Sequence, residues 1–556
     1  MPNLQYSLAY EPIELRFGTS GRRGRVVDLT QLEIYINALA ELEYLQSLPA
    51  GEGGIVRGEE FCLAHDLRTS SIAFVEAASG RGEIGQAVVE AIVDAGMRPV
   101  NLGPIPTPAL THYALSRNLG SIMVTGSHIP FDLNGYKLNT SAGELLKEHE
   151  APIAEKVRNV RARIYAQPFD ESPFNERGMF KAGHQELLPV NEAARMAYIE
   201  RYESFFAGST LRGRRILVYQ HSAVGRDLLV DLLEHLGAEV IARGRSDQFV
   251  AIDTEAIDDA QLAAMQAMAD EVALDYGPLW AVVSTDGDSD RPLILGVEAR
   301  KVKFFGGDLV GMVAAEYLGA DAVVVPISCN DGIDHGHLRN ALEPKTRIGS
   351  PYVIAGMAAA RRKGRNLVCG WEANGGFLLG SDVERNRKVL RALPTRDAFL
   401  PILAVLFSAR GKNITLPELF ARLPNRYSRA GLLRNFPREN GRRMVELLTA
   451  SGNGNLAHVT RQLEEFFTPA AGFSDIARID YTDGVRIIFS NGEVAHFRPS
   501  GNADEFRIYA VAGTQARANE IVDAGLAEPD GIIRSMERAL LGVIDSIPCN
   551  PPGVRS

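Results

Sequence analysis

Residues 308–326 read DLVGMVAAEYLGADAVVVP. Apolar residues recur at helical spacing up to Gly319, and the run that follows is typical of a short buried strand. The same order of helix, glycine and strand returns at residues 84–102, 227–242 and 353–370. Buried strands that alternate with amphipathic helices are typical of α/β proteins. The repetition therefore predicts several α/β layers in series, with mixed, mainly parallel sheets.

The C-terminal part has a different pattern. Residues 476–501, IARIDYTDGVRIIFSNGEVAHFRPSG, alternate between apolar and polar side chains, and Asp-Gly at 483–484 and Asn-Gly at 491–492 are hairpin turn signals. An amphipathic helical segment follows at 531–545. These features predict a smaller α+β domain with antiparallel strands, which begins near residues 425–430.

Length, charge and cysteine content exclude several classes of protein. The 556 residues correspond to three or four domains at about 150 residues each. A net charge of −10 does not suggest a nucleic-acid-binding face, and four scattered cysteines suggest neither a disulfide framework nor a zinc cluster. Because neither a targeting segment nor an 18-residue apolar stretch is evident, we expect a cytoplasmic protein without a membrane partner.

The strongest chemical motif is STDGDSDRP at residues 284–292, which follows an apolar strand-like run. Asp286, Asp288 and Asp290 place three carboxylates within five residues, and hard divalent cations prefer such oxygen ligands. An EF-hand is excluded, because its required Gly and Glu positions hold Arg291 and Val297. The alternative interpretation is a solvated acidic turn.

A second motif is MVTGSHIPFDLNGYKLN at residues 123–139. An apolar strand leads into a small-residue loop with Ser127 and His128, and Lys137 follows ten residues after the serine. A serine that exchanges phosphoryl groups needs an exposed hydroxyl, nearby donors and a cation. On its own, the loop could equally be a helix N-cap beside a structural histidine.

Three further loops are weaker signals. FGTSGRRG at 17–24 and RPSGNADEFRIY at 498–509 combine glycine, hydroxyl side chains and arginine, a composition that suits anion binding. In CGWEANGGFLLGSD at 369–382, Glu372 follows a predicted strand and could accept sugar hydroxyls. Ordinary surface turns and a buried ion pair are the respective alternatives.

In their order along the chain (FGTSGRRG, TGSHIP, DGDSDR, WEANGG and RPSGNADEFR), the five loops resemble those of the α-D-phosphohexomutase superfamily, which includes phosphoglucomutases and phosphomannomutases. HDLRTSS at 65–71, GPIPTP at 103–108 and KTRIGSPY at 345–352 also match. The resemblance covers about residues 15–510. Three loops depart from the usual pattern. T-A-S-H-N-P is here TGSHIP, and Asn502-Ala503-Asp504 replaces T-E-P after RPSG. In the sugar loop, Asn374 stands where Ser is common in bacterial members, and Gly376 stands where some members carry His.

The resemblance implies a fold and a set of residue roles. The fold would be three similar α/β domains, 1–185, 186–303 and 304–427, and a smaller α+β domain, 428–556, around a central cleft. Ser127 would carry the phosphoryl group, and its phosphate would join Asp286, Asp288 and Asp290 in holding one Mg²⁺. The residues at the phosphoryl-transfer end would be Ser127, His128, Lys137 and Arg23. Substrate contacts would come from Glu372, Asn374, Arg291, Arg498, Ser500, Gly501 and Asn502.

The predicted activity is interconversion of hexose 6-phosphate and hexose 1-phosphate through a hexose 1,6-bisphosphate. Mannose phosphate is the first expected substrate, with glucose or glucosamine phosphate as alternatives. Two other classes stay open: a metal-dependent sugar phosphatase, which would not need Ser127, and a catalytically silent sugar-phosphate sensor, toward which the altered Ile129 and Ala503 point.

Overall fold

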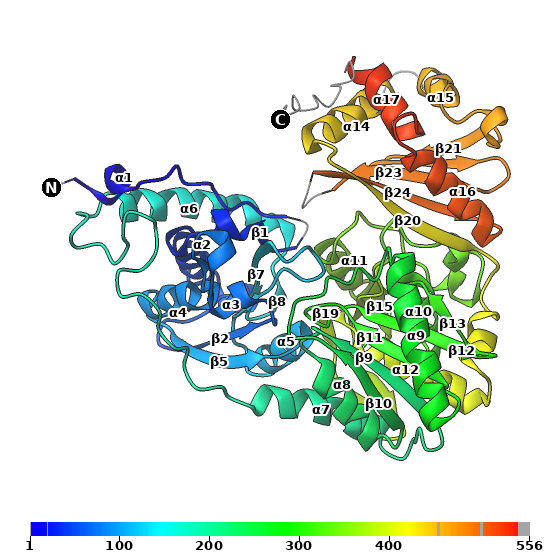
Figure 1. Cartoon of the computed structure of the whole chain (residues 1–556), viewed down its shortest axis with the longest axis horizontal. Helices are drawn as coiled ribbons and strands as arrows, with labels where there is room; N and C mark the ends of the chain where they lie inside the picture. Colours follow the sequence, from blue (N-terminus) through cyan, green and yellow to red (C-terminus); the bar gives the residue numbers. More distant parts are fainter. Residues whose placement is uncertain (1, 19, 453–455, 501–503, 543–556) are drawn as a thin grey trace, which may run out of the picture. The chain divides into compact units, whose positions relative to one another are not determined.

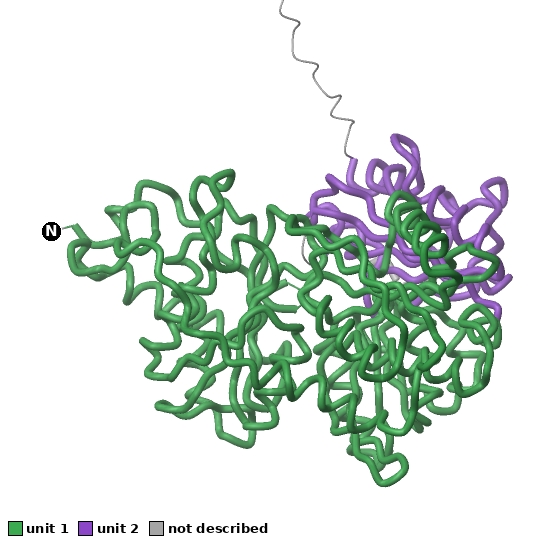
Figure 2. The backbone as a smooth tube through the Cα atoms, turned by 60° about the horizontal axis from the view of Figure 1, so that its bottom comes forward, with its two compact units in different colours: residues 1–424 green, residues 425–556 purple. Residues whose placement is uncertain are grey.

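The computed structural model describes residues 2–18, 20–452, 456–500 and 504–542. The chain divides into two compact units, Met1–Pro424 and Asn425–Ser556 (Figure 2). The first unit contains three mixed sheets with helices on both faces, and the second contains one antiparallel sheet (Figure 1). The described residues include no helix long and apolar enough to cross a membrane.

The first sheet has the strand order β1-β7-β6-β2-β5, and β8 pairs with β7. Leu63 and Ile122 face helices α2, α4 and α6, whereas Ala64 and Met123 face α5 and α7 on the other side. The sheet is therefore buried on both faces, as expected for strands with continuous apolar runs. The elements are β1 (Arg22–Arg25), β2 (Glu60–His65), β5 (Arg98–Pro104), β6 (Ser121–Val124), β7 (Leu133–Thr140), β8 (Gly143–Glu144), α2 (Gln31–Leu45), α4 (Ile84–Asp94), α5 (Thr107–Leu115), α6 (Glu150–Tyr165) and α7 (Ala193–Phe206).

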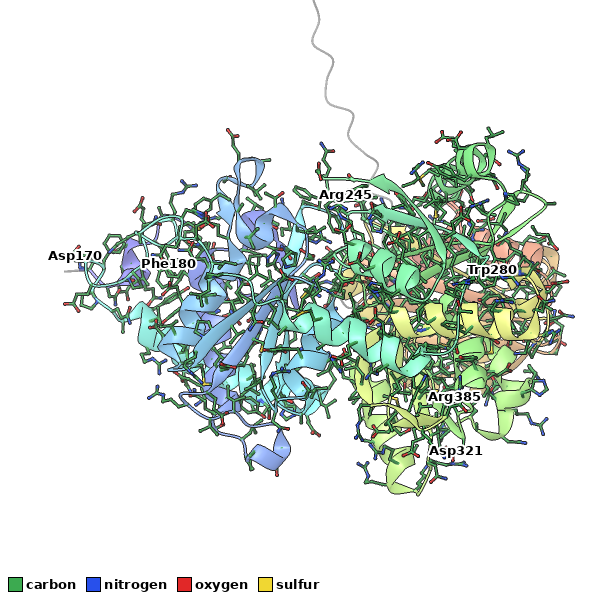
Figure 3. The ribbon with its side chains drawn as sticks, turned by 90° about the horizontal axis from the view of Figure 1, so that it is seen from below. Asp170, Phe180, Arg245, Trp280, Asp321 and Arg385 are labelled. Atoms are coloured by element: carbon green, nitrogen blue, oxygen red, sulfur yellow. The ribbon has the colours of Figure 1, made fainter. Side chains whose placement is uncertain are left out.

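The second sheet has the order β10-β9-β11-β12-β13. Leu217 and Val282 pack on α9, and Val218 and Val283 face the large core that also contains α8. Trp280, which Figure 3 labels, directly precedes β11. The guanidinium of Arg214 lies over its ring. The elements are β9 (Arg215–His221), β10 (Glu239–Arg245), β11 (Ala281–Thr285), β12 (Pro292–Glu298), β13 (Lys301–Phe305), α8 (Arg226–His235) and α9 (Asp259–Tyr276).

The third sheet has the order β14-β15-β16-β19. Val324 and Val368 pack on α11, whereas Val323 and Cys369 face the core shared with α10 and α12. That core extends through all three sheets, so one apolar cluster joins them. The elements are β14 (Ala322–Val324), β15 (Val368–Trp371), β16 (Phe377–Leu379), β19 (Leu393–Asp397), α10 (Gly307–Leu318), α11 (Ser350–Arg362), α12 (Phe399–Lys412) and, beside α12, α13 (Leu416–Phe420).

The second unit contains an antiparallel sheet of order β20-β24-β23-β22-β21, with its own core. Both predicted hairpin turns occur, and Gly484 and Gly492 adopt the positive φ values that these turns require. The elements are β20 (Tyr427–Arg434), β21 (Ile476–Asp480), β22 (Val485–Phe489), β23 (Val494–Pro499), β24 (Glu505–Ala512), α14 (Arg438–Gly452), α15 (Leu456–Glu464), α16 (Gln515–Leu526) and α17 (Ile532–Leu541).

The predicted mixed α/β class is confirmed, but the expectation of mainly parallel sheets is wrong. Each of the three sheets combines a parallel pair with antiparallel strands: β2 and β6 precede antiparallel β7, β9 and β11 precede β12, and β14 and β15 precede β16. The repeated order of helix, glycine and strand marked the parallel strands β5, β10, β14 and β15, and it missed the antiparallel hairpin partners. The predicted boundaries at 185/186, 303/304 and 427/428 stay predictions.

Candidate functional site

The serine, metal and sugar loops occupy equivalent places in the three sheets. Each connects a parallel strand to its antiparallel neighbour: β6 to β7, β11 to β12, and β15 to β16. The backbone reverses direction in each loop. The loop side chains therefore lie at the carboxyl ends of β6, β11 and β15, where they can form a site. The structure brings the serine loop and the metal loop into direct contact.

The metal loop is fully buried. Asp286, Asp288 and Asp290 have no exposed surface, and one carboxylate oxygen of each lies within 4.8 Å of the others. Asp288 Oδ1 and Asp290 Oδ1 are buried without a hydrogen-bond donor. Since unpaired buried carboxylate oxygens are costly, this donor set fits a hard divalent cation.

The three neighbouring carboxylates do not ionise equally easily. Burial and the charges of Asp288 and Asp290 raise the pKa of Asp286 well above its ordinary value. Burial also opposes ionisation of Asp288, but Lys137 and the hydroxyl of Thr107 outweigh it and lower the pKa of Asp288. A divalent cation at this place would allow all three groups to be ionised together.

The serine loop places its hydroxyl against the metal loop. Ser127 Oγ donates to Asp286 Oδ2 at 2.9 Å and lies 3.4 Å from His128 Nδ1. Ser127 has a φ of 55°, a left-handed conformation that is uncommon for non-glycine residues. Thr125 Oγ1 accepts from Ser127 N at 2.7 Å and helps to hold this turn.

Arg68 holds the serine loop in place, and its side chain has no exposed surface. Its guanidinium donates to the carbonyl oxygens of the loop residues Ser127, Ile129, Pro130 and Leu133, at 2.6–3.1 Å. Asp66 bonds Arg68 Nε at 3.2 Å and also accepts from Thr125 Oγ1 at 2.7 Å. The HDLRTSS segment at 65–71 matches the family in sequence, and the structure gives it this supporting role.

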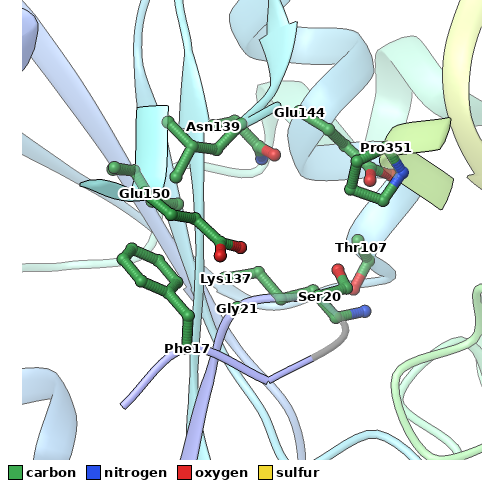
Figure 4. Close-up of a pocket in the computed structure, with 11 residues that line it drawn as sticks. Phe17, Ser20, Gly21, Thr107, Lys137, Asn139, Glu144, Glu150 and Pro351 are labelled. Atoms are coloured by element: carbon green, nitrogen blue, oxygen red, sulfur yellow. The ribbon is translucent and has the colours of Figure 1, made fainter. Parts of the chain in front are cut away.

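Lys137 and Arg23 come from the paired strands β7 and β1. Lys137 Nζ donates to Asp288 Oδ2 at 2.6 Å and to Asp290 Oδ2 at 2.7 Å. Burial lowers the pKa of Arg23 to about 10, although the charge of Asp288 opposes the shift. Both cations therefore lie near the metal loop. Lys137 also lines a pocket together with Phe17, Ser20, Gly21 and Thr107 (Figure 4).

The sugar loop follows β15, as predicted. Glu372 is 3% exposed, and Asn374 Oδ1 accepts from Gly376 N at 3.0 Å, which tightens the turn. Sequence reasoning missed Arg396, which connects the loops: its Nε donates to Asp290 Oδ2 at 3.0 Å and one Nη donates to Glu372 Oε2 at 3.1 Å. Its segment, PTRDAF, resembles no motif, so only the pairing of β16 with β19 reveals it.

Arg291 also lies against the metal loop. Its Nε is 3.8 Å from Asp286 Oδ2 and 3.6 Å from Asp290 Oδ1, and its backbone N donates to Asp286 Oδ1. The metal loop is thus surrounded by cations from all three sheets.

Replacing Arg396 with methionine is expected to lower the free energy of unfolding by about 3–5 kcal/mol, because it removes the buried cation between Asp290 and Glu372. Arg391→Met is the control, since Arg391 forms an ion pair with Asp382 from a largely exposed position. That change should cost about 1 kcal/mol or less. Chemical denaturation of both variants measures the difference, and equal losses would contradict a special role for Arg396.

The predicted phosphate loop belongs to the second unit. Arg498 lies near the end of β23, directly opposite Arg507 of β24, and its buried Nε makes no hydrogen bond although Asp483 Oδ1 is 3.4 Å away. Ser500 N donates to the carbonyl oxygen of Glu505. Gly501 and Asn502 lie outside the described residues. Two arginines at paired positions of neighbouring strands suit an anion.

Comparison with known proteins identifies the family. Residues 14–163 match the model described as phosphoglucomutase/phosphomannomutase, alpha/beta/alpha domain I, and residues 306–427 match domain III of the same family. A phosphomannomutase of Salmonella muenchen is 38% identical over 518 residues, 92% of this chain and 95% of that protein. The chain belongs to the phosphoglucomutase/phosphomannomutase family. It is accordingly an enzyme of the phosphohexomutase type.

Other members of the family agree with this assignment. A phosphomannomutase of Sinorhizobium fredii is 37% identical over 517 residues, 92% of this chain and 98% of that protein. The crystal structure of a phosphoglucomutase/phosphomannomutase family protein from Burkholderia thailandensis covers 97% of this chain and 98% of its own, with a TM-score of 0.61 and 18% identity. A putative phosphomannomutase from Thermus thermophilus covers 92% and 98%, with a TM-score of 0.62 and 20% identity. These two structures support the fold.

Proposed function

We propose that this family member is a phosphomannomutase that interconverts mannose 6-phosphate and mannose 1-phosphate in the cytoplasm through phospho-Ser127. The observation that carries the mechanism is the bond of Ser127 Oγ to Asp286 in a fully buried carboxylate cluster. The choice of sugar is supported by the two phosphomannomutases at 37–38% identity over 92% of the chain. A phosphoglucosamine mutase of Azorhizobium caulinodans is 28% identical over 56% of the chain.

In the proposed cycle, a hydroxyl oxygen of the bound sugar phosphate attacks the phosphorus on Ser127. The bond from phosphorus to Ser127 Oγ breaks, the sugar hydroxyl loses its proton, and the serine oxygen regains one. The product is a hexose 1,6-bisphosphate, whose other phosphoryl group then returns to Ser127. Lys137, Arg23 and His128 are the candidates for moving these protons, because His128 lies beside the serine and the two cations lie near the metal loop that the serine contacts.

Asp286, Asp288, Asp290 and the phosphate of Ser127 would hold one Mg²⁺, which would offset negative charge on the transferring group. The two orphaned oxygens of Asp288 and Asp290 support this assignment. Glu372 and Asn374 are proposed to bind sugar hydroxyls. A solved N-acetylphosphoglucosamine mutase of Aspergillus fumigatus is a complex with glucose 1,6-bisphosphate, which supports the proposed intermediate by analogy of fold.

The test compares mannose, glucose and glucosamine 1-phosphates with Mg²⁺ and a bisphosphate primer. We expect the highest kcat/KM for mannose 1-phosphate. A higher value for glucosamine phosphate would contradict the proposed substrate. Release of inorganic phosphate in place of an isomer would contradict the mutase reaction itself.

Replacing Arg498 with alanine is expected to raise KM about tenfold to a hundredfold for the 1-phosphate and the 6-phosphate alike, because a charge-assisted contact contributes about 1.5–3 kcal/mol. The symmetry arises because both isomers would present their unreacted phosphate to Arg498. Arg429→Ala, which removes an exposed pair with Asp523 in the same unit, is the control. Forward and reverse kinetics measure the effect, and a loss for one isomer alone would exclude a shared phosphate site.

A further inference from the structure

Phe249 is an aromatic residue that no motif marked. It lies in the segment between β10 and α9, and its ring stacks on the guanidinium of Arg68, with 3.7 Å between the guanidinium carbon and the ring centroid. Arg68 is the side chain that donates hydrogen bonds to four carbonyl oxygens of the serine loop. A cation–π contact with a desolvated guanidinium is among the stronger contacts of this kind.

One edge of the same ring meets the metal loop. A Cβ atom added to Gly287 would lie 2.9 Å from two ring atoms of Phe249 and 2.7 Å from the carbonyl oxygen of Ser127. The ring, the serine loop and the backbone between Asp286 and Asp288 therefore meet at one point. Gly126 completes the arrangement, because a Cβ there would lie 2.5 Å from Arg68 Nε.

One turn, residues 221–226, holds both the segment of Phe249 and the metal loop. Toward the segment, Ser222 Oγ accepts from Val250 N at 2.7 Å. Toward the metal loop, Val224 N donates to the carbonyl oxygen of Gly287 at 3.0 Å, and Gly225 N donates to Ser289 Oγ at 2.9 Å. The position of Phe249 is thus set by the element that positions the metal loop.

We propose that Phe249 is a positioning residue: by stacking on Arg68, it fixes the position of Ser127 relative to the metal loop. Arg68 is attached to the serine loop, and Phe249 is attached to the support of the metal loop. Their stack therefore connects the two halves of the phosphoryl-transfer site across the first and second sheets. The effect of Phe249 on catalysis rests on the proposed function. The contact that connects the two loops through Arg68 does not depend on it.

Hydrogen exchange of the full chain tests the connection without reference to activity. Phe249→Leu should speed exchange about tenfold in the 123–137 peptide, because the serine loop opens more readily once the stack is lost. Tyr276→Leu is the matched control, since Tyr276 stacks on Arg243 in the second sheet region, away from this loop. Unchanged exchange in Phe249→Leu would overturn the proposal. Phe249→Met replaces this variant if it fails to fold.

A double-mutant cycle on Mn²⁺ binding tests the consequence for the site. Protein is first charged with a hexose 1,6-bisphosphate, and the added phosphate is verified by mass. Phe249→Leu should then weaken Mn²⁺ binding about tenfold in protein that carries phosphoserine, but less than about twofold in the Ser127→Ala background. Equal losses in both backgrounds, or no loss in either, would overturn the proposal.

The two experiments separate this inference from the proposed function. If no phosphate appears on Ser127, the proposed function fails, and the exchange experiment still decides the role of Phe249. If phosphate appears and exchange is unchanged, the role of Phe249 fails while the proposed function stands.

Discussion

Replacing Ser127 with alanine is expected to abolish mutase turnover, with a loss of about 10⁴-fold or more, since the variant lacks the hydroxyl that is proposed to carry the phosphoryl group. Ser127 Oγ lies 2.9 Å from Asp286 in a left-handed turn that Thr125 and Arg68 hold. Alanine removes the acceptor oxygen and leaves these supports in place, so the fold should persist.

Two measurements check this expectation. Coupled assays follow turnover, and peptide mapping of the wild-type protein should show about 80 Da on residues 123–137 in part of the sample, the mass of one phosphoryl group. Ser141→Ala is the control, because Ser141 is also buried and its hydroxyl bonds only the carbonyl oxygen of Gly54 among the contacts described. Normal turnover by Ser127→Ala would refute the phosphoenzyme mechanism.

Asp288→Asn is expected to weaken divalent metal binding by about 100-fold or more, since even outer-shell partners of a metal contribute about 10- to 100-fold. Asp288 provides a buried oxygen without a donor, and its other oxygen already accepts from Lys137 and Thr107. An amide keeps the shape of the side chain but removes the charge that attracts the metal. Activity should fall with it.

Titration calorimetry with Mg²⁺ and activity after chelation measure this effect. Wild-type activity should stop with chelator and return with Mg²⁺. Asp382→Asn, which changes a carboxylate paired with Arg391 away from the site, should leave metal binding unchanged. Activity that is indifferent to chelator would remove the basis of the metal assignment.

The layers of this fold were predictable because their signals are local. Gly96, Gly237, Gly319 and Gly364 all adopt positive φ values at the ends of helices, where an L side chain would be strained. The apolar runs after them form β5, β10, β14 and β15. Pairing direction was less predictable, because β7, β12 and β16 are hairpin partners whose antiparallel register depends on contacts made after the chain folds back.

The chemistry of the loops could also be read from residue types. Three aspartates in alternation have few explanations other than a cation, and the order of five loops indicated the family before any distance was known. The supports of those loops carried no such signal. Arg396 and Phe249 belong to segments that match no motif, and each acts on residues more than 20 positions away in sequence.

The sequence by itself determined the α/β layers, the turns between them and the identity of the reactive groups, because helix caps, turn glycines and carboxylate clusters depend on neighbouring residues. Tertiary structure alone decided the geometry of the site. Ser127 and Asp286 are 159 residues apart and meet at 2.9 Å only because a shared core fixes the first two sheets against each other. Burial then made the contacts strong, since charges such as Arg68 and Arg396 must be fully paired once water is excluded from them.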